Sequence, residues 1–343
     1  MRHMGRMKGV VERPNQIESL HMLRGLACLL VILCHTQGTE FGQTGVDFFL
    51  VISGFMMMLS TDKVGGVHHY WIKRIKRIIP LYYSVTLFTT ILVMLFPFLF
   101  HSYEISVEYV TKSLLFIPYY HNGIPGPVME LGWTLNYEMF FYLIFYISSL
   151  ISFKYRGIIT CIVLVTYSGI GKMISLPLIL KYWSDPVILE FCFGIVTYYL
   201  WKSGLEKNRR QLKKGPLSVV ILVLLIVSSA AMDFLMNYNS RDRGLIVGGI
   251  AFVVVLFLAI FDKQIYKIEI LSKIGKDSYQ LYLLHPFIVR AIDLVLGIFF
   301  RHNLITAIIN LIISTVILEM SIYLWRKGCA FIGSKICNRQ SFL

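Results

Sequence analysis

Two ionisable residues inside the first apolar stretch constrain what this chain can fold into. The run from Leu20 to His35 is apolar enough to enter a membrane, yet it carries Arg24 near its start and His35 at its end. A charged side chain at the centre of a bilayer costs roughly 2.5–3.5 kcal/mol on the mildest insertion scale, so such a residue indicates a functional site. The two residues are 11 positions apart, which is about three helical turns, or roughly 16 Å along the axis. One helix face is therefore expected to present a guanidinium and an imidazole.

The rest of the chain predicts an all-α, polytopic membrane protein. Of its 343 residues, 56% are hydrophobic and 15% are charged, and a mean hydropathy of +0.67 excludes an ordinary soluble domain. The second apolar segment is shorter than the ~20 residues of a full span, so it is expected to be tilted, enclosed by protein or partly re-entrant. We expect about ten transmembrane helices, at Leu20–His35, Val46–Leu59, Ile78–Phe100, Trp133–Phe153, Ile158–Ile174, Pro186–Trp201, Leu217–Met236, Gly244–Phe261, Ser278–Phe300 and Leu304–Trp325.

The distribution of basic residues predicts the orientation of these helices. With both termini in the cytoplasm, 25 of the 33 Lys and Arg residues fall in inner segments and six in outer loops, which is a strong positive-inside pattern. The formal charge of +14 is then explained by loops beside anionic membrane lipid, and no nucleic-acid partner is expected. We divide the chain into a basic cytoplasmic N-terminal segment (1–16), a transmembrane domain (17–327) and a cytoplasmic C-terminal tail (328–343).

The cysteine and histidine patterns predict neither a disulfide framework nor a metal site. Four of the six cysteines fall inside predicted helices, and His68 and His69 have no cysteine or carboxylate nearby in the sequence. The sequence contains no phosphate-binding loop, dinucleotide fingerprint or serine nucleophile elbow. The chemistry is therefore expected to come from polar residues at membrane depth.

Arg24 and His35 permit two interpretations. In the simpler one, Arg24 extends to the inner membrane interface and His35 lies at the outer one. In the functional one, Arg24 holds an anion and His35 is a catalytic base. Their separation is comparable to the length of an extended pantetheine arm, which suggests that a thioester acts as acyl donor and enters from the cytoplasm. Asp47, in the glycine-containing stretch from Gly42 to Phe55, is a candidate to orient the imidazole of His35, with helix capping as the alternative role.

A basic run from Trp71 to Tyr83 adjoins the third predicted helix. Arg74 and Arg77 lie three positions apart and so share a helix face, an arrangement that suits bidentate contact with phosphate. Basic residues at a cytoplasmic helix end are also expected from topology alone. We consider Arg74 and Arg77 candidate donor-binding residues.

Glu138 is a carboxylate within an apolar run, WTLNYEMFFY (Trp133 to Tyr142). A carboxylate at membrane depth needs a partner, and His35 is expected on the same side of the membrane. Glu138 is therefore the second candidate to orient the catalytic imidazole.

The segment IGKDSYQLYLLHP, at the start of the ninth predicted helix, contains two tyrosines and a histidine. Tyr279, Tyr282 and His285 are candidates to line a channel for the donor. His285 also precedes Pro286, so a local helix irregularity is an alternative explanation for it.

Taken in order, these segments resemble the acyltransferase-3 family of bacterial integral membrane acyltransferases. The resemblance covers about Ile17 to Trp325 and rests on Arg24-x10-His35, GVDFFLVISGF, a basic run ending in RIIPLY, WTLNYEMFFY, LEFCFG and IGKDSYQLYLLHP. It implies an acetyl-CoA-dependent O-acetyltransferase of the bacterial cell (inner) membrane that modifies exopolysaccharide, lipopolysaccharide or a lipid-linked glycan. It also implies that His35 is the essential histidine, Arg24 its motif partner, and Arg74 and Arg77 essential residues near the donor.

We expect acyl-CoA to act as a donor substrate, not as a permanently bound cofactor. His35 then either deprotonates a sugar hydroxyl or carries the acyl group transiently. A flippase or exporter of lipid-linked sugar is the alternative, since it also uses a charged cavity but consumes no acyl-CoA. A membrane sensor or scaffold would not need so many buried ionisable residues.

Overall fold

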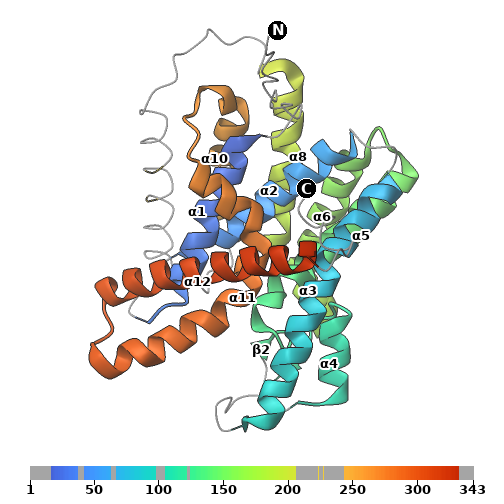
Figure 1. Cartoon of the computed structure of the whole chain (residues 1–343). Coiled ribbons are helices and arrows are strands. Elements are labelled where there is room, and N and C mark those ends of the chain that lie inside the picture. The colour runs from blue at the N-terminus through green and yellow to red at the C-terminus, as the bar shows by residue number, and fades with distance from the viewer. Residues whose placement is uncertain are drawn as a thin grey trace, which may run out of the picture.

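The protein is built from helices (Figure 1). The structure, a computed structural model, describes residues 17–37, 42–62, 67–97, 105–121, 124–205 and 243–331, together with Val223 and Val227. Within these residues there are eleven α-helices and one pair of two-residue antiparallel strands, β1 (Tyr120–His121) and β2 (Ile124–Pro125). The helices are α1 (Glu18–Cys34), α2 (Gly45–Thr61), α3 (Val67–Leu95), α4 (Val107–Leu114), α5 (Trp133–Ile151), α6 (Arg156–Met173), α7 (Leu178–Trp183), α8 (Glu190–Leu200), α10 (Arg243–Ile260), α11 (Glu269–Phe299) and α12 (Leu304–Phe331).

This architecture confirms the predicted all-α fold, and its apolar helices indicate a polytopic membrane protein. Nine of the ten predicted segments coincide with helices of the described residues. The N-terminal segment 1–16, all of Leu217–Met236 except Val223 and Val227, and residues 332–343 of the predicted tail (328–343) lie outside the described residues, whereas α12 continues through residues 328–331. The number of ten spans and the cytoplasmic termini stay predictions. Among the described residues, the helices long and apolar enough to cross a bilayer cover His68–Leu95, Glu130–Ile151, Glu269–Phe299 and Leu304–Gly328, and α2 and α10 are shorter apolar helices.

Two of the long helices begin well before the apolar runs that predicted them. α3 starts at Val67 instead of Ile78, and α11 at Glu269 instead of Ser278. Hydropathy marks only the part of a helix that suits lipid, whereas Lys, Arg and Glu are good helix formers and continue the helix into the polar layer. The basic run that contains Arg74 is therefore helical throughout.

α1 packs along α11 more extensively than any other described pair of helices packs, and the order of their contacts shows that the two run in the same direction. Parallel neighbours are expected of the first and ninth of ten spans, because both run outward in the predicted topology. The contacts along the pair are, in order, Glu18 with Ser272, Arg24 with Ser278, and His35 with His285.

A glycine on each helix brings the backbones of α1 and α11 together. A Cβ atom added at Gly25 would lie 2.3 Å from the carbonyl oxygen of Leu271, and one added at Gly275 would lie 1.8 Å from that of His21. No side chain fits at either position. Close approach through small residues is typical of membrane helix pairs, and here it fixes the register in which α1 meets α11.

α2 lies inside the helix bundle. Fourteen of its 17 residues are buried, mainly against α8, α1 and α10. Gly54 of α2 and Gly194 of α8 again permit close backbone contact, since added Cβ atoms would lie 2.2 Å from the carbonyl oxygen of Phe191 and 2.0 Å from that of Val51. The short second segment is thus enclosed by protein, which is one of the three outcomes expected for it.

Candidate active site

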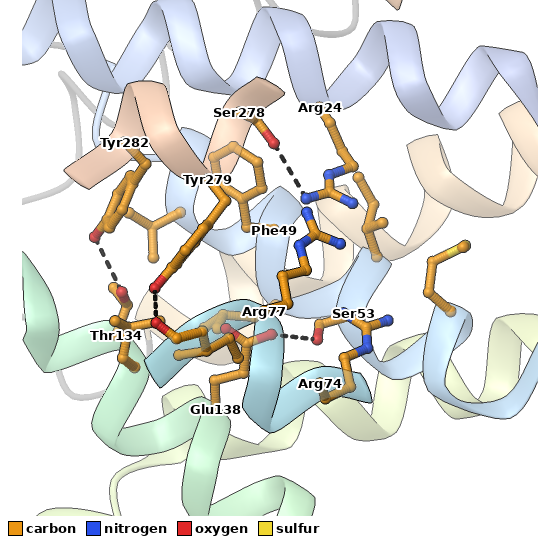
Figure 2. A pocket seen from close by; sticks show the side chains of 16 residues that line it. Arg24, Phe49, Ser53, Arg74, Arg77, Thr134, Glu138, Ser278, Tyr279 and Tyr282 are labelled. Atoms are coloured by element: carbon orange, nitrogen blue, oxygen red, sulfur yellow. Dashed lines mark hydrogen bonds between the residues drawn. The ribbon is translucent and has the colours of Figure 1, made fainter. Parts of the chain in front are cut away.

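A cavity of about 760 Å³ is lined by residues of α1, α2, α3, α5 and α11 (Figure 2). Apolar side chains of α2, such as Phe49 and Met56, contribute to its lining beside the polar residues. Six of the nine predicted site residues line it, namely Arg24, Arg74, Arg77, Glu138, Tyr279 and Tyr282.

Arg74 is held in place by aromatic hydroxyl groups. Its Nε donates to the Tyr70 hydroxyl at 2.5 Å, and its Nη1 donates to the Tyr142 hydroxyl at 3.2 Å. Tyr142 in turn donates to Glu138, which also accepts a hydrogen bond from Ser53 at 2.9 Å. The carboxylate of Glu138 therefore balances the charge of Arg74 through the hydroxyl of Tyr142.

Arg24 and Arg77 have fewer protein partners. Figure 2 shows their guanidinium groups turned toward one another in the cavity. Within the described part of the chain, Arg24 makes one side-chain hydrogen bond, from Nη2 to Ser278 Oγ at 3.1 Å, and the side chain of Arg77 makes none. Two neighbouring cations repel one another, so this part of the cavity favours an anionic ligand.

Tyr279 and Tyr282 form part of the cavity wall, and their hydroxyl groups make hydrogen bonds to other groups of the protein. Tyr279 donates to the carbonyl oxygen of Ile78 at 2.6 Å. Tyr282 donates to the carbonyl oxygen of Leu131 at 3.1 Å and lies 3.0 Å from the hydroxyl of Thr134. The two residues thus tie α11 to α3 and to the start of α5.

His35 lies at the far end of α1, outside the cavity lining. It caps the C-terminus of the helix and is exposed. Its Nδ1 lies 2.7 Å from the carbonyl oxygen of Val31, and because a carbonyl can only accept, Nδ1 carries the hydrogen. The Cys34 sulfur lies 3.2 Å from the same nitrogen. The backbone therefore selects the tautomer whose Nε2 keeps a lone pair and can act as base or nucleophile.

His285 places a second imidazole beside His35. The two rings meet edge to face with centroids 4.9 Å apart. Pro286 has no N–H, so the carbonyl oxygen of Tyr282 lacks its usual helical donor, and Nδ1 of His285 donates to it at 2.8 Å. The helix continues through Pro286. The irregularity considered from the sequence is therefore limited to one hydrogen bond, in which the side chain of His285 replaces the missing backbone N–H. His285 is fully buried, and its Nε2 has no partner among the described groups.

The two predicted carboxylates are not among the described contacts of the His35 ring. Glu138 is bonded to Ser53 and Tyr142, and Asp47 is buried in the first turn of α2. The hydrogen on Nδ1 of His35 goes to a backbone carbonyl instead. Participation of Asp47 or Glu138 in the reaction stays a prediction. Within the described ranges, no group of His, Cys, Asp and Glu side chains gathers to hold a metal ion.

The cavity also contains polar residues that the sequence did not single out. Ser278 anchors Arg24, and Thr134 contacts Tyr282. Ser53 both donates a hydrogen bond to Glu138 and lines the cavity. Ser278 lies four residues before Tyr282, and Thr134 lies four residues before Glu138. Helical spacing could therefore have indicated that they share a helix face with predicted site residues.

Comparison with known proteins identifies the relatives of this arrangement. A family model described as an acyltransferase domain matches residues 17–324. The exopolysaccharide production protein ExoZ of Rhizobium meliloti (strain 1021) is 27% identical over 259 residues, which cover 73% of this chain and 78% of the relative. The putative acetyltransferase ORF330 of Acidianus two-tailed virus is 26% identical over 297 residues, or 82% of this chain and 86% of the relative.

A third relative is longer than this chain. The O-acetyltransferase OatA of Staphylococcus aureus (strain NCTC 8325 / PS 47) is 26% identical over 320 residues, which cover 80% of this chain but 51% of OatA. The similarity therefore concerns about half of that protein. No solved structure matches the chain.

Proposed function

The chain belongs to the family of membrane acyltransferases defined by this acyltransferase domain, and on that premise we propose that it moves an acetyl group from cytoplasmic acetyl-CoA to a sugar hydroxyl. The acceptor in this proposal is a cell-surface polysaccharide or a lipid-linked glycan. The names of two relatives support it, an exopolysaccharide production protein and an O-acetyltransferase. The observation that carries the proposal is that one helix, α1, brings Arg24 to an arginine-lined cavity and His35 to a second imidazole.

The cavity suits the diphosphate group of a coenzyme A thioester. Planar guanidinium groups bind phosphate oxygens in pairs, and the side chains of Arg24 and Arg77 have donors to spare. The lining contains three arginines, Arg24, Arg74 and Arg77, and one carboxylate, Glu138. The excess of positive charge would be neutralised by the two negative charges of a diphosphate.

The arm of the donor would then extend along α1. The helical rise places His35 about 16 Å from Arg24, which is comparable to an extended pantetheine arm. With the diphosphate at the arginines, the thioester would reach the imidazole. A cytoplasmic donor could in this way modify a glycan on the outer face while CoA stays on the inner side.

The geometry of His35 supports two routes for the transfer. In the first, Nε2 takes the proton of the sugar hydroxyl as its oxygen attacks the thioester carbonyl, the C–S bond breaks, and the leaving thiolate recovers the proton from the imidazolium. General base catalysis of this kind contributes about 10²- to 10⁴-fold in rate. In the second, Nε2 itself attacks the thioester carbonyl, the C–S bond breaks and the CoA thiolate leaves; the sugar oxygen then attacks the acyl-imidazole, the N–acyl bond breaks, and the hydroxyl proton is released and neutralises the thiolate. The first route predicts a ternary complex and the second predicts ping-pong kinetics.

Acceptor-dependent release of CoA from acetyl-CoA by purified membranes tests this proposal. Wild type and His35→Ala are compared at matched expression, and the variant is expected to lose about 10²- to 10⁴-fold in rate. Binding of acetyl-CoA should survive in the variant, because the arginine cavity is unchanged. Equal CoA release by both proteins would remove His35 from the chemistry. Transport of a lipid-linked sugar without CoA release would favour an exporter.

A further inference from the structure

A buried carboxylate that the mechanism above does not use lies two helical turns beyond His285. Asp293 of α11 is 4% exposed, although the neighbouring Leu294 and Val295 are exposed on the outer face of the helix. A buried carboxylate in an apolar helix is unfavourable unless its oxygens are hydrogen-bonded, and such a residue indicates a functional role.

Both oxygens of Asp293 have defined partners. Oδ2 accepts a hydrogen bond from the backbone N–H of Gln37 at 3.2 Å, and Oδ1 accepts one from Nδ2 of Asn310 at 2.7 Å. Asn310 belongs to α12 and is fully buried. Its Nδ2 also donates to the carbonyl oxygen of Val289 at 3.0 Å, and its Oδ1 accepts from Ser314 at 2.6 Å. The amide of Asn310 is therefore fully used and holds Asp293 in one orientation.

The partner on α1 is the informative one. Gln37 lies two residues after His35, in the turn that follows the last helical residue, Cys34. The N–H of Gln37 lies beyond the helix and has no intrahelical carbonyl to bond, so the carboxylate of Asp293 supplies its acceptor. Here α11 contacts the end of α1 at two points, through the ring of His285 and through the carboxylate of Asp293.

We propose that Asp293, fixed by Asn310, is a positioning residue that holds the end of α1 so that Nε2 of His35 reaches the thioester and the acceptor. The proposal rests on the role of His35 given above. Asp293 acts through the amide of Gln37 and needs no contact with substrate. Cohesion of α11 and α12 does not depend on it alone, because Asp277 pairs with Arg326 at the opposite end of the same two helices.

Asp277 supplies a matched control. It is a buried aspartate of α11 bonded to α12, as Asp293 is, but it lies at the other end of the helix. The kinetics of Asp293→Ala, Asp293→Asn and Asp277→Asn are compared in the CoA-release assay. A displaced catalytic group typically costs up to about 10²-fold, so we expect kcat to fall about 100-fold in Asp293→Ala and about 10-fold in Asp293→Asn, which keeps one acceptor oxygen. The KM for acetyl-CoA should stay within about twofold in both, and Asp277→Asn should change neither constant by more than about twofold.

A second measurement needs no acceptor. Diethyl pyrocarbonate modifies free imidazole nitrogens, and mass spectrometry of the purified, detergent-solubilised protein gives the rate at which His35 reacts. We expect this rate to change severalfold in Asp293→Ala and to stay at the wild-type value in Asp277→Asn, with both variants melting within a few degrees of the wild type.

The outcomes separate this inference from the function on which it rests. Wild-type kcat and wild-type His35 labelling in Asp293→Ala would overturn the positioning role while leaving the acyltransferase proposal intact. Equal losses in Asp293→Asn and Asp277→Asn, accompanied by lower melting temperatures, would also overturn it, because both aspartates would then be structural. Full activity of His35→Ala would instead reject the role of His35 in the transfer, whatever the labelling shows.

Discussion

The two ends of the α1–α11 pair carry opposite kinds of polar group. At one end, Arg24 meets Ser278 and shares a cavity with Arg77, and both guanidinium groups keep their charge. At the other end, His35 and His285 meet edge to face, and each donates its Nδ1 hydrogen to a backbone carbonyl. The first arrangement is suited to binding an anion, and the second to accepting a proton. In the proposed function, this helix pair would thus keep donor binding and acyl transfer about 16 Å apart.

The difference follows from what each group requires in a membrane protein. A guanidinium cannot lose its charge, so it needs an anion, water or a polar cavity. An imidazole can be neutral, and one carbonyl acceptor is enough to bury it. This explains why the arginines line a cavity of about 760 Å³ while His285 is completely buried.

Among the substitutions that distinguish the arginine end from the imidazole end, removal of Arg77 should have the largest kinetic effect. A charge-assisted hydrogen bond is worth about 1.5–3 kcal/mol, so Arg77→Ala should raise the KM for acetyl-CoA about 10- to 100-fold. The variant should leave kcat within about threefold, because His35 is untouched. Arg77→Lys keeps the charge but not the planar fork, so its KM should be intermediate. Initial rates over a range of acetyl-CoA concentrations measure both constants. A fall in kcat at constant KM would contradict the division into a donor-binding arginine end and a catalytic imidazole end.

A smaller effect is expected at the imidazole end from Pro286→Ala. Alanine supplies an N–H that can bond to the carbonyl oxygen of Tyr282, in competition with Nδ1 of His285. Loss of that hydrogen bond, worth about 1 kcal/mol, would free the ring that supports His35 and lower kcat about 3- to 10-fold. The KM for acetyl-CoA should not change, and the melting temperature should be equal or higher, because a regular helical hydrogen bond replaces the proline. A lower melting temperature together with a raised KM would indicate general loosening of α11.

The sequence predicts well what depends on local periodicity. Arg24 and His35 were expected on one helix face, and both indeed contact α11. Arg74 and Arg77, one turn apart, were expected to act together, and both line the same cavity. In each case the helical repeat alone determines which side chains share a face.

The partners of these residues could not be predicted, because they come from distant segments. Ser278 is 254 residues from Arg24 in the chain, and no local rule pairs the two helices. The register depends on close contact at Gly25 and Gly275, and a glycine in an apolar run does not reveal what packs against it. Asp293 gives the same signal as Glu138, a carboxylate in an apolar run, but its bond to Gln37 is visible only in the folded protein.

The smallest kinetic effect is expected in a polar cluster that belongs to neither end. Asp62 follows α2 and bonds to Arg156 of α6, to Tyr198 of α8 and to Lys202, which follows α8. Asp62→Asn should leave kcat and the KM for acetyl-CoA within about twofold of wild type. It should lower the melting temperature by about 2–4 °C, which corresponds to a loss on the order of 1 kcal/mol in a partly exposed ion cluster. Thermal unfolding and initial rates of the same preparation test both statements.

The pH dependence of that stability difference makes the comparison sharper. Burial raises the pKa of Asp62, but hydrogen bonds from Lys202, Tyr198 and Arg156 outweigh it and lower the pKa from 3.8 to about 2. Since the folded pKa lies below the unfolded one, the cluster stabilises the fold fully above about pH 4 and loses this contribution as the pH falls toward 2. The difference in melting temperature between wild type and Asp62→Asn should therefore be constant from about pH 5 to pH 8 and shrink below about pH 4. If the difference in melting temperature changed instead at about pH 6–7, where histidine titrates, the Asp62 cluster would be coupled to His35 and His285. The cluster could then not be treated as independent of the α1–α11 pair.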